Sequence, residues 1–458
     1  MTRRTLVLDV VGLTGDLLDA GMPNLQALAR DGAARPLRTI LPAVTCAVQS
    51  TFTTGLPPAG HGCVANGWFF RDLAEVALWR QSNRLVTGEK IWDAARRRDP
   101  GFTCAKLFWW YNMYSTVDFA VTPRPLYPAD GRKIPDVYSE PSELRAELTQ
   151  RLGPFPLFKF WGPAADISST RWIADCAGYV DESYRPTLTL VYLPHLDYNL
   201  QRLGPRHPAL AGDLRAVDDI CGGLIARARA DGSRVIVLSE YGITDVSGPV
   251  HINRALREAK LLRVKTELGR EMLDAGASEA FAVADHQVAH VYVRKPSLVG
   301  DVKRLLEGLP GVEVVLDEPG KRAAGLDHPR SGELVAVTEA DRWFTYYYWL
   351  DDRVAPDFAR TVDIHRKPGY DPAELFVDPA LRWPKIKIAG KLLRKSLGFR
   401  YLMDVIPLDA TLVKGSHGRP TDSPGAGPVF ISSEGRLVPD GEVAATAVKD
   451  LVLAHLFS

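Results

Sequence analysis

Hydrophobic and polar positions along the chain follow two different periods. Short hydrophobic runs, rich in β-branched residues and closed by glycine or polar residues, are typical of buried strands. Such runs occur at Thr5–Val11, Thr187–Leu193, Arg234–Ser239, Val288–Val293, Glu333–Thr338 and Trp343–Trp349. Segments with a helical pattern lie among them, at Asn24–Ala29, Thr45–Thr54 and Pro208–Ala230. Strands that alternate with helices predict an α/β layered fold.

Composition narrows the class of protein. The chain has 458 residues, 46% of them hydrophobic and 24% charged, which excludes a wholly disordered chain and allows a large core. Because 56 Lys and Arg residues balance 55 Asp and Glu residues, no basic excess favours nucleic acid as a partner. The five cysteines contain no CxxC pair, so they predict neither a disulfide framework nor a zinc knuckle.

The hydrophobic stretches are too short for targeting or membrane insertion. The first apolar run is broken by Asp9, whereas a signal peptide needs a longer one. No stretch approaches the ~18 uninterrupted apolar residues of a membrane span. We therefore expect a cytoplasmic protein with reduced cysteines. The sequence leaves the oligomeric state open.

Three predicted strands carry a carboxylate at or near their ends. Asp9 lies within the first, Asp197 just past the second and Glu240 just past the third. Ligands of α/β sheets bind outside the carboxyl ends of the strands, so these acids are candidates for one cleft. Each of them alone would also suit a turn or a helix cap.

Five segments, in order over nearly the whole chain, resemble a known family. They are Leu8–Leu13; Pro42–Thr45 with Thr54-Gly55, Pro58, His61-Gly62 and Asn66; Leu193–Asp197 with Gly204-Pro205; Ser239–Thr244; and Gly415–Gly418 with Gly427–Phe430. The chain is similar to the type I phosphodiesterase / nucleotide pyrophosphatase branch of the alkaline phosphatase superfamily. The resemblance implies an α/β/α sandwich with a mostly parallel central sheet and inserted cap-like segments. It also implies a single domain over residues 1–458, with insertions within 70–170 and 255–400.

The resemblance assigns roles to individual residues. Thr45 corresponds to the nucleophile bound to metal, and Asn66 to the amide that holds a phosphoryl oxygen. Asp9, Asp197 and His417 correspond to metal ligands. The sequence departs from the family at Gln201, where the family has a histidine, and at the pair Glu240-Tyr241, where it has Asp-His.

The altered ligand set changes the expected metal. The candidate ligands are rich in oxygen and comprise Asp9, Thr45, Asp197, Gln201, Glu240, Tyr241 and His417. For Tyr241, the alternative is a hydrogen bond or packing at the edge of the site. Carboxylate, amide and water ligands suit Mg, Ca or Mn, whereas zinc favours nitrogen and sulfur, and a tyrosinate favours ferric iron. We therefore expect one or two divalent ions harder than zinc, or weakly bound zinc.

Other side chains are candidates to replace the missing ligands. His195 shares a strand face with Asp197 if both lie in a strand, and Asp363 shares one with His365 in the same way. His286 and His328 are further candidates. The alternative for each of these histidines is a structural hydrogen bond.

The residues and the resemblance together predict a metal-dependent hydrolase. Its substrate is a small molecule with a phosphodiester, pyrophosphate or phosphonate-type group, which Thr45 attacks at phosphorus while Asn66 and metal hold the oxygens. The alternative is a catalytically weak or inactive phosphoanion-binding protein on the same fold. Retention of Asp9, Asp197 and His417 beside the nucleophile argues against that alternative.

Two further segments have a distinctive composition. Residues 382–400 carry basic and apolar side chains but no acidic one, which suits contact with an anionic lipid or an anionic substrate. A solvated basic helix beside the active site is the alternative. Phe108–Tyr114 is strongly aromatic and either walls a pocket or packs in the core.

Overall fold

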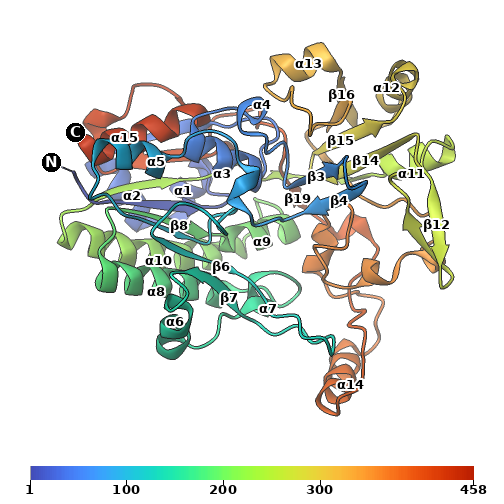
Figure 1. The fold of residues 1–458 in the computed structure, drawn as a ribbon, viewed down its shortest axis with the longest axis horizontal. Coiled ribbons are helices and arrows are strands. Elements are labelled where there is room, and N and C mark those ends of the chain that lie inside the picture. Colours follow the sequence, from blue (N-terminus) through green and yellow to red (C-terminus); the bar gives the residue numbers. More distant parts are fainter. Residues whose placement is uncertain (1) are drawn as a thin grey trace.

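The computed structural model describes residues 2–458, and its centre is one large mixed sheet (Figure 1). In this part of the chain nine strands pair in the order β21-β2-β20-β9-β1-β8-β5-β6-β7. The strands from β9 to β6 are parallel to their neighbours, while β20 and β7 are antiparallel. The bounds are β21 Val443–Ala444, β2 Ala33–Arg38, β20 Val429–Ser432, β9 Arg234–Leu238, β1 Thr5–Val10, β8 Leu188–Leu193, β5 Cys104–Leu107, β6 Phe119–Pro123 and β7 Val137–Glu140.

Helices cover both faces of this sheet, as the α/β/α prediction requires. One layer contains helices that contact α10, and the other contains helices that contact α15. The first comprises α1 (Gly15–Gly21), α2 (Pro23–Asp31), α8 (Ile167–Tyr184), α9 (His195–Leu203) and α10 (Leu210–Ala230); the second comprises α3 (Thr45–Thr54), α5 (Ile91–Arg98) and α15 (Val448–Phe457). The mostly parallel, layered fold is thus confirmed.

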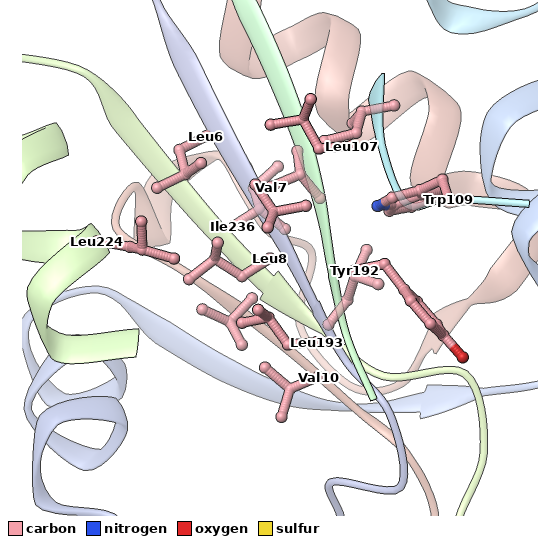
Figure 2. Packing of buried hydrophobic residues seen from close by; sticks show 14 of the residues in the cluster. Leu6, Val7, Leu8, Val10, Leu107, Trp109, Tyr192, Leu193, Leu224 and Ile236 are labelled. Atoms are coloured by element: carbon pink, nitrogen blue, oxygen red, sulfur yellow. The ribbon is translucent and has the colours of Figure 1, made fainter. Parts of the chain in front are cut away.

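The central strands are hydrophobic on both faces because both faces are covered. Leu6, Leu8 and Val10 point toward Leu224 of α10, while Val7 points the other way, toward Trp109 (Figure 2). All six residues of β1 are buried. A strand buried on both faces gives a continuous hydrophobic run. This explains why the runs at β1, β8 and β9 were recognisable in the sequence.

A second lobe holds its own sheet and core. Its four antiparallel strands pair in the order β14-β15-β17-β16, with bounds Ala280–Asp285, Val288–Val293, Leu334–Thr338 and Val312–Leu316. The helices α11 (Ile252–Glu258), α12 (Val299–Glu307) and α13 (Glu318–Ala323) and the hairpin β3 (Gly67–Phe70) and β4 (Glu75–Leu78) accompany this sheet (Figure 1). Most of this lobe therefore comes from residues 248–413. Residues 104–140, within the first expected insertion, instead supply the edge strands β5, β6 and β7 of the main sheet.

Two local predictions were wrong. The expected strand Trp343–Trp349 forms a strand only as β18 (Arg342–Phe344), which pairs with β11 (Gly248–Val250). Residues Thr345–Trp349 are irregular but fully buried, so their hydrophobicity reflects burial in the second core and not strand structure. His195 and Asp197 lie in the first turn of α9, and residues two apart in a helix do not share a face. Asp363 and His365 also lie outside any strand.

The structure also bears on the cysteines and on membrane-spanning helices. All five cysteines are buried and free. Among residues 2–458, every helix is too short or too polar to cross a membrane.

Candidate active site

Three neighbouring parallel strands bring the predicted acids together. Asp9 lies near the end of β1, Asp197 in the first turn of α9 after β8, and Glu240 directly after β9. Asp9 and Glu240 are fully buried and Asp197 is 7% exposed. Because β1 pairs with both β8 and β9 in parallel, the three strand ends reach the same edge of the sheet.

Gln49 joins two of these carboxylates. Its Nε2 atom donates to Asp9 Oδ2 at 3.1 Å and to Glu240 Oε1 at 2.7 Å. Its Oε1 accepts from the backbone N–H of Trp110 at 2.7 Å, which fixes the orientation of the amide. Gln49 lies four residues after Thr45, on the same face of α3. Sequence analysis missed it, although that spacing was available as a signal.

Thr45 is the first residue of α3, as expected, and α3 has the predicted bounds Thr45–Thr54. The backbone N–H of Cys46 donates to Asn66 Oδ1 at 2.9 Å, so a distant side chain caps the helix. Asn66 Nδ2 donates to Asp285 Oδ1 at 3.0 Å, and its backbone N–H donates to Asp285 Oδ2 at 2.8 Å. Because a carboxylate only accepts hydrogen bonds, Asp285 fixes which end of the Asn66 amide is the nitrogen. The second N–H of Asn66 Nδ2 is then left for a ligand.

The two residues that depart most from the family, Gln201 and Tyr241, bind Asp197. Gln201 Nε2 donates to Asp197 Oδ2 at 2.7 Å, and the Tyr241 hydroxyl donates to Asp197 Oδ1 at 3.2 Å. The Tyr241 hydroxyl also lies 3.3 Å from Thr45 Oγ1, and Tyr370 donates to Gln201 Oε1 at 3.0 Å. Where the family has two metal-binding histidines, this chain therefore has two hydrogen-bond donors to one carboxylate.

His417 lies against Tyr241 and His286. Its ring stacks on the Tyr241 ring at 3.5 Å between centroids, and the His286 ring centroid is also 3.5 Å away. His417 Nδ1 donates to the carbonyl oxygen of Ala43 at 2.8 Å, which leaves the Nε2 lone pair 4.0 Å from Asp197 Oδ1. Burial lowers the pKa of His417 to about 3, so the ring is neutral. His286 has a positive φ of 58° in the β14–β15 turn, and its neighbours hold it in this strained conformation.

Burial also disfavours the charged form of the carboxyl groups. It raises the pKa of both Asp197 and Glu240 to about 7. The pKa of Asp9 is well above its usual range, mainly through burial and then through the nearby charge of Glu240. An anionic substrate beside this cluster requires that a proton or a cation neutralises part of its charge.

A cavity of about 550 Å³ opens beside Thr45. One end is polar and includes Thr45, Asp197 and His417. The remaining wall is mostly aromatic and aliphatic, with residues that include Trp79, Trp110, Phe158, Phe160, Trp161, Tyr198, Tyr370, Ile388 and Leu392. The aromatic segment Phe108–Tyr114 is divided between both expected roles, because Trp110 lines the cavity while Phe108 and Trp109 pack in the core.

The other candidate ligands lie apart from this cluster or have other partners. His195 Nε2 is 2.9 Å from Asp213 Oδ1, which makes it a structural histidine of the helix layer. The backbone N–H of Asp363 donates to Glu374, and His365 lines the cavity. His328 lies against Gly62 in the turn after α4 (Pro58–His61). Asp285 was missed because it is far from Asn66 in sequence and carries no local motif.

The donor set differs from that of a two-zinc centre. Within residues 2–458, no three His, Cys, Asp or Glu side chains form a group able to hold a metal ion. Several buried atoms at the site nevertheless lack a hydrogen-bond partner within this range, among them Asp9 Oδ1, Glu240 Oε2 and His417 Nε2. The two carboxylate oxygens, with the Thr45 hydroxyl close by, fit a cation that prefers oxygen ligands.

The structure thus combines a layered sheet, a threonine at a helix start and acids at the ends of three neighbouring parallel strands. The sequence model of the family type I phosphodiesterase / nucleotide pyrophosphatase matches residues 5–371. The chain therefore belongs to this family, whose members typically use divalent metals.

Individual relatives agree with this assignment. An uncharacterized pyrophosphatase/phosphodiesterase of Schizosaccharomyces pombe is 26% identical over 254 residues, which cover 53% of this chain and 45% of that protein. The chain thus matches less than half the length of this curated relative. Phosphonoacetate hydrolase of Sinorhizobium meliloti 1021, solved with phosphonoacetate, has a TM-score of 0.63 at 15% identity, covering 99% of this chain and 96% of its own. Murine ectonucleotide pyrophosphatase / phosphodiesterase 5 has a TM-score of 0.57 at 15% identity, covering 99% and 95%. These two likenesses concern the fold.

Proposed function

We propose that the protein hydrolyses a phosphodiester, pyrophosphate or phosphonate-type substrate with Thr45 as the nucleophile. The observation that carries the proposal is the position of Thr45 at the polar end of the cavity and at the start of α3. A helix N-terminus favours an anion and an alkoxide, because the first backbone N–H groups have no partner within the helix.

The residues around Thr45 suit the two half-reactions of such a hydrolysis. Thr45 Oγ1 forms a bond to phosphorus as the bond from phosphorus to the leaving group breaks, and water then cleaves the Thr45–phosphorus linkage. The threonine proton passes to water as Oγ1 attacks, and the hydrolytic water returns a proton to Oγ1 when the linkage is cleaved. The free amide N–H of Asn66 is suited to hold a phosphoryl oxygen.

A divalent ion belongs to this proposal, in agreement with the use of such ions in the family. Asp9, Glu240 and Thr45 would hold it, and Asp197 with His417 would supply ligands if a second ion binds. When bound, the ion supplies a Lewis acid that lowers the pKa of the nucleophile and offsets phosphoryl charge. Gln49, Gln201 and Tyr241 keep the carboxylates oriented by donating hydrogen bonds to them.

A substrate panel with metal analysis tests the proposed function. Hydrolysis of an aryl phosphodiester, a dinucleotide pyrophosphate or phosphonoacetate supports it. Phosphate binding without turnover of any of the three, with each divalent metal added in turn, would instead establish the alternative of an inactive phosphoanion-binding protein. The observation that favours this alternative is that Gln201 and Tyr241 donate hydrogen bonds to Asp197 at positions where the resemblance implies ligand histidines.

The metal itself is predicted to be harder than zinc. We expect that Mn or Mg restores more activity than Zn to protein stripped with a chelator, because the ligands are mainly oxygen atoms. Elemental analysis of protein purified without added metal provides the second measurement. Stoichiometric, tightly bound zinc would contradict this prediction.

Glu240→Ala and Tyr241→Phe should affect metal binding differently. We expect Glu240→Ala to weaken binding of the ion by at least about tenfold, since it removes a charged oxygen ligand. Tyr241→Phe removes a donor to Asp197 and should leave the metal content unchanged. Titration calorimetry with Mn and elemental analysis of both variants give the comparison. Full metal retention by Glu240→Ala would show that this carboxylate is not a ligand.

A further inference from the structure

The helix α14 (Pro384–Ser396) extends away from both lobes (Figure 1). None of its residues is buried. We use the name α14 surface for residues 382–402. Its large apolar side chains are between 37% and 69% exposed and comprise Trp383, Ile386, Leu392, Leu393, Leu397, Phe399, Tyr401 and Leu402. Large exposed apolar side chains gathered on one segment of a protein surface indicate a contact site.

The apolar residues of α14 form two separate faces. Ile386, Leu393 and Leu397 are spaced by seven and four residues, so they share one face of the helix, and all three are exposed. Ile388 and Leu392, four residues apart, lie on another face and line the cavity. Packing over the cavity therefore accounts for Ile388 and Leu392 and leaves the face of Ile386 without an occupant.

Basic residues accompany the exposed helix face that carries Ile386, Leu393 and Leu397. Lys387 and Lys391 pair with Asp404. In the described part of the chain, the other basic residues of the α14 surface make no ion pair: Arg382, Lys385, Arg394, Lys395 and Arg400. Uncompensated cations beside exposed leucine, isoleucine, tryptophan and phenylalanine suit an anionic bilayer, which accepts the apolar side chains and attracts the charges. The chain as a whole has a formal charge of +1, so a second copy offers no overall acidic complement.

The same segment reaches the cavity that ends at Thr45. Ile388, Leu392, Lys395 and Tyr401 line this cavity, whose remaining wall is mainly apolar. An apolar chain that leaves the bilayer at α14 would thus meet a continuous apolar path toward the polar end. We propose that the α14 surface docks on an anionic lipid bilayer and receives from it a phosphoryl substrate that carries an apolar chain. The substrate part of this proposal rests on the proposed function, whereas the docking part does not.

Vesicle flotation tests the docking. Wild-type protein should float with vesicles of phosphatidylcholine mixed with phosphatidylglycerol, float far less with phosphatidylcholine alone, and lose binding as salt increases. The triple variant Lys385→Ser, Arg394→Ser, Arg400→Ser should bind the anionic vesicles about 100-fold more weakly, because each basic residue near a bilayer contributes about 1 kcal/mol. The triple variant Ile386→Ser, Leu393→Ser, Leu397→Ser should also lose binding.

Leu268→Ser is the matched control. Leu268 is fully exposed in the turn between β12 (Val264–Glu267) and β13 (Arg270–Leu273), far from α14 in the sequence. This variant should float like the wild type. Because α14 contributes no buried residue, both triple variants should keep the wild-type melting temperature, which separates lost docking from lost folding.

Several results would overturn the docking. These are absence of binding to anionic vesicles, equal binding by the triple variants, and a wild-type dimer in sedimentation equilibrium that the Ile386 triple variant abolishes. The substrate part requires faster hydrolysis of a long-chain than of a short-chain aryl phosphodiester, with the difference lost in Leu392→Asp. Flotation without hydrolysis of any substrate would reject the proposed function and keep the docking. Hydrolysis without flotation would reject the docking and keep the proposed function.

Discussion

Thr45→Ala is expected to lower kcat for an aryl phosphodiester by at least about 10³-fold, the loss typical when a covalent nucleophile is removed. Thr45 is 3% exposed and its hydroxyl lies beside the only group of buried acids that the predicted strand ends bring together. Without Oγ1, no phosphorylated enzyme forms. Thr45→Ser keeps the hydroxyl and should retain part of the turnover.

Thr53→Ala is the matched control for this experiment. Thr53 lies on the same helix, is 5% exposed, and donates only to the backbone carbonyl oxygens of Gln49 and Ser50. Its replacement should leave kcat within a few-fold of wild type. Rapid-quench detection of a phosphorylated intermediate in wild type adds a direct measurement. Near-normal turnover by Thr45→Ala would remove Thr45 from the mechanism.

Gln49→Leu is expected to lower the free energy of unfolding of chelator-treated protein by about 3 kcal/mol. The variant removes two hydrogen bonds to buried carboxylates, each of which contributes about 1.5–3 kcal/mol when the acceptor is charged, and also the bond that Gln49 Oε1 accepts from the backbone N–H of Trp110. Proton uptake by Asp9 or Glu240 offsets part of the loss, because burial already raises both pKa values. Chemical denaturation with and without Mn gives the measurement.

The dependence on metal distinguishes the causes of this loss. If a cation binds Asp9 and Glu240, adding it should recover most of the stability of Gln49→Leu. The control is Gln26→Leu, because Gln26 is half-buried and donates only to backbone carbonyl oxygens of Leu18 and Asp19. We expect about 1 kcal/mol or less for this control. Equal losses for both variants would show that the hydrogen bonds from Gln49 do not stabilise the acidic pair.

The sequence predicted the parts of the site that depend on local patterns. The hydrophobic runs of β1, β8 and β9 located the strand ends, and with them Asp9, Asp197 and Glu240. The bounds of α3 were also evident, because Pro42 lies shortly before its start at Thr45 and Gly55 follows its end at Thr54. Gly55 has φ 73° and donates its N–H to the carbonyl oxygen of Thr51, a helix end that favours glycine.

Partners of these residues could not be predicted in the same way. Gln201 and Tyr241 were candidate metal ligands, and in the structure both donate to Asp197. A sequence does not specify which acceptor an amide or a phenol finds. Asp285 meets Asn66 only because β14 packs against β3, the strand that directly follows Asn66 but lies far from β14 in the sequence. Asp197 was expected just past a strand, and α9 begins there, at His195 itself, so the strand-face relation considered for His195 and Asp197 does not occur.

The contact between Asn66 and Asp285 ties the geometry of the nucleophile to the placement of a different sheet. Asp285 ends β14 in the second lobe, and through Asn66 it holds the first turn of α3 in the main layer. A shift of the second sheet would therefore move the amide that caps the helix carrying Thr45. Mutations in the core of the second lobe, remote from the cavity, should alter turnover before they unfold the main sheet. The reaction geometry thus depends on the alignment of two cores whose residues alternate along the sequence.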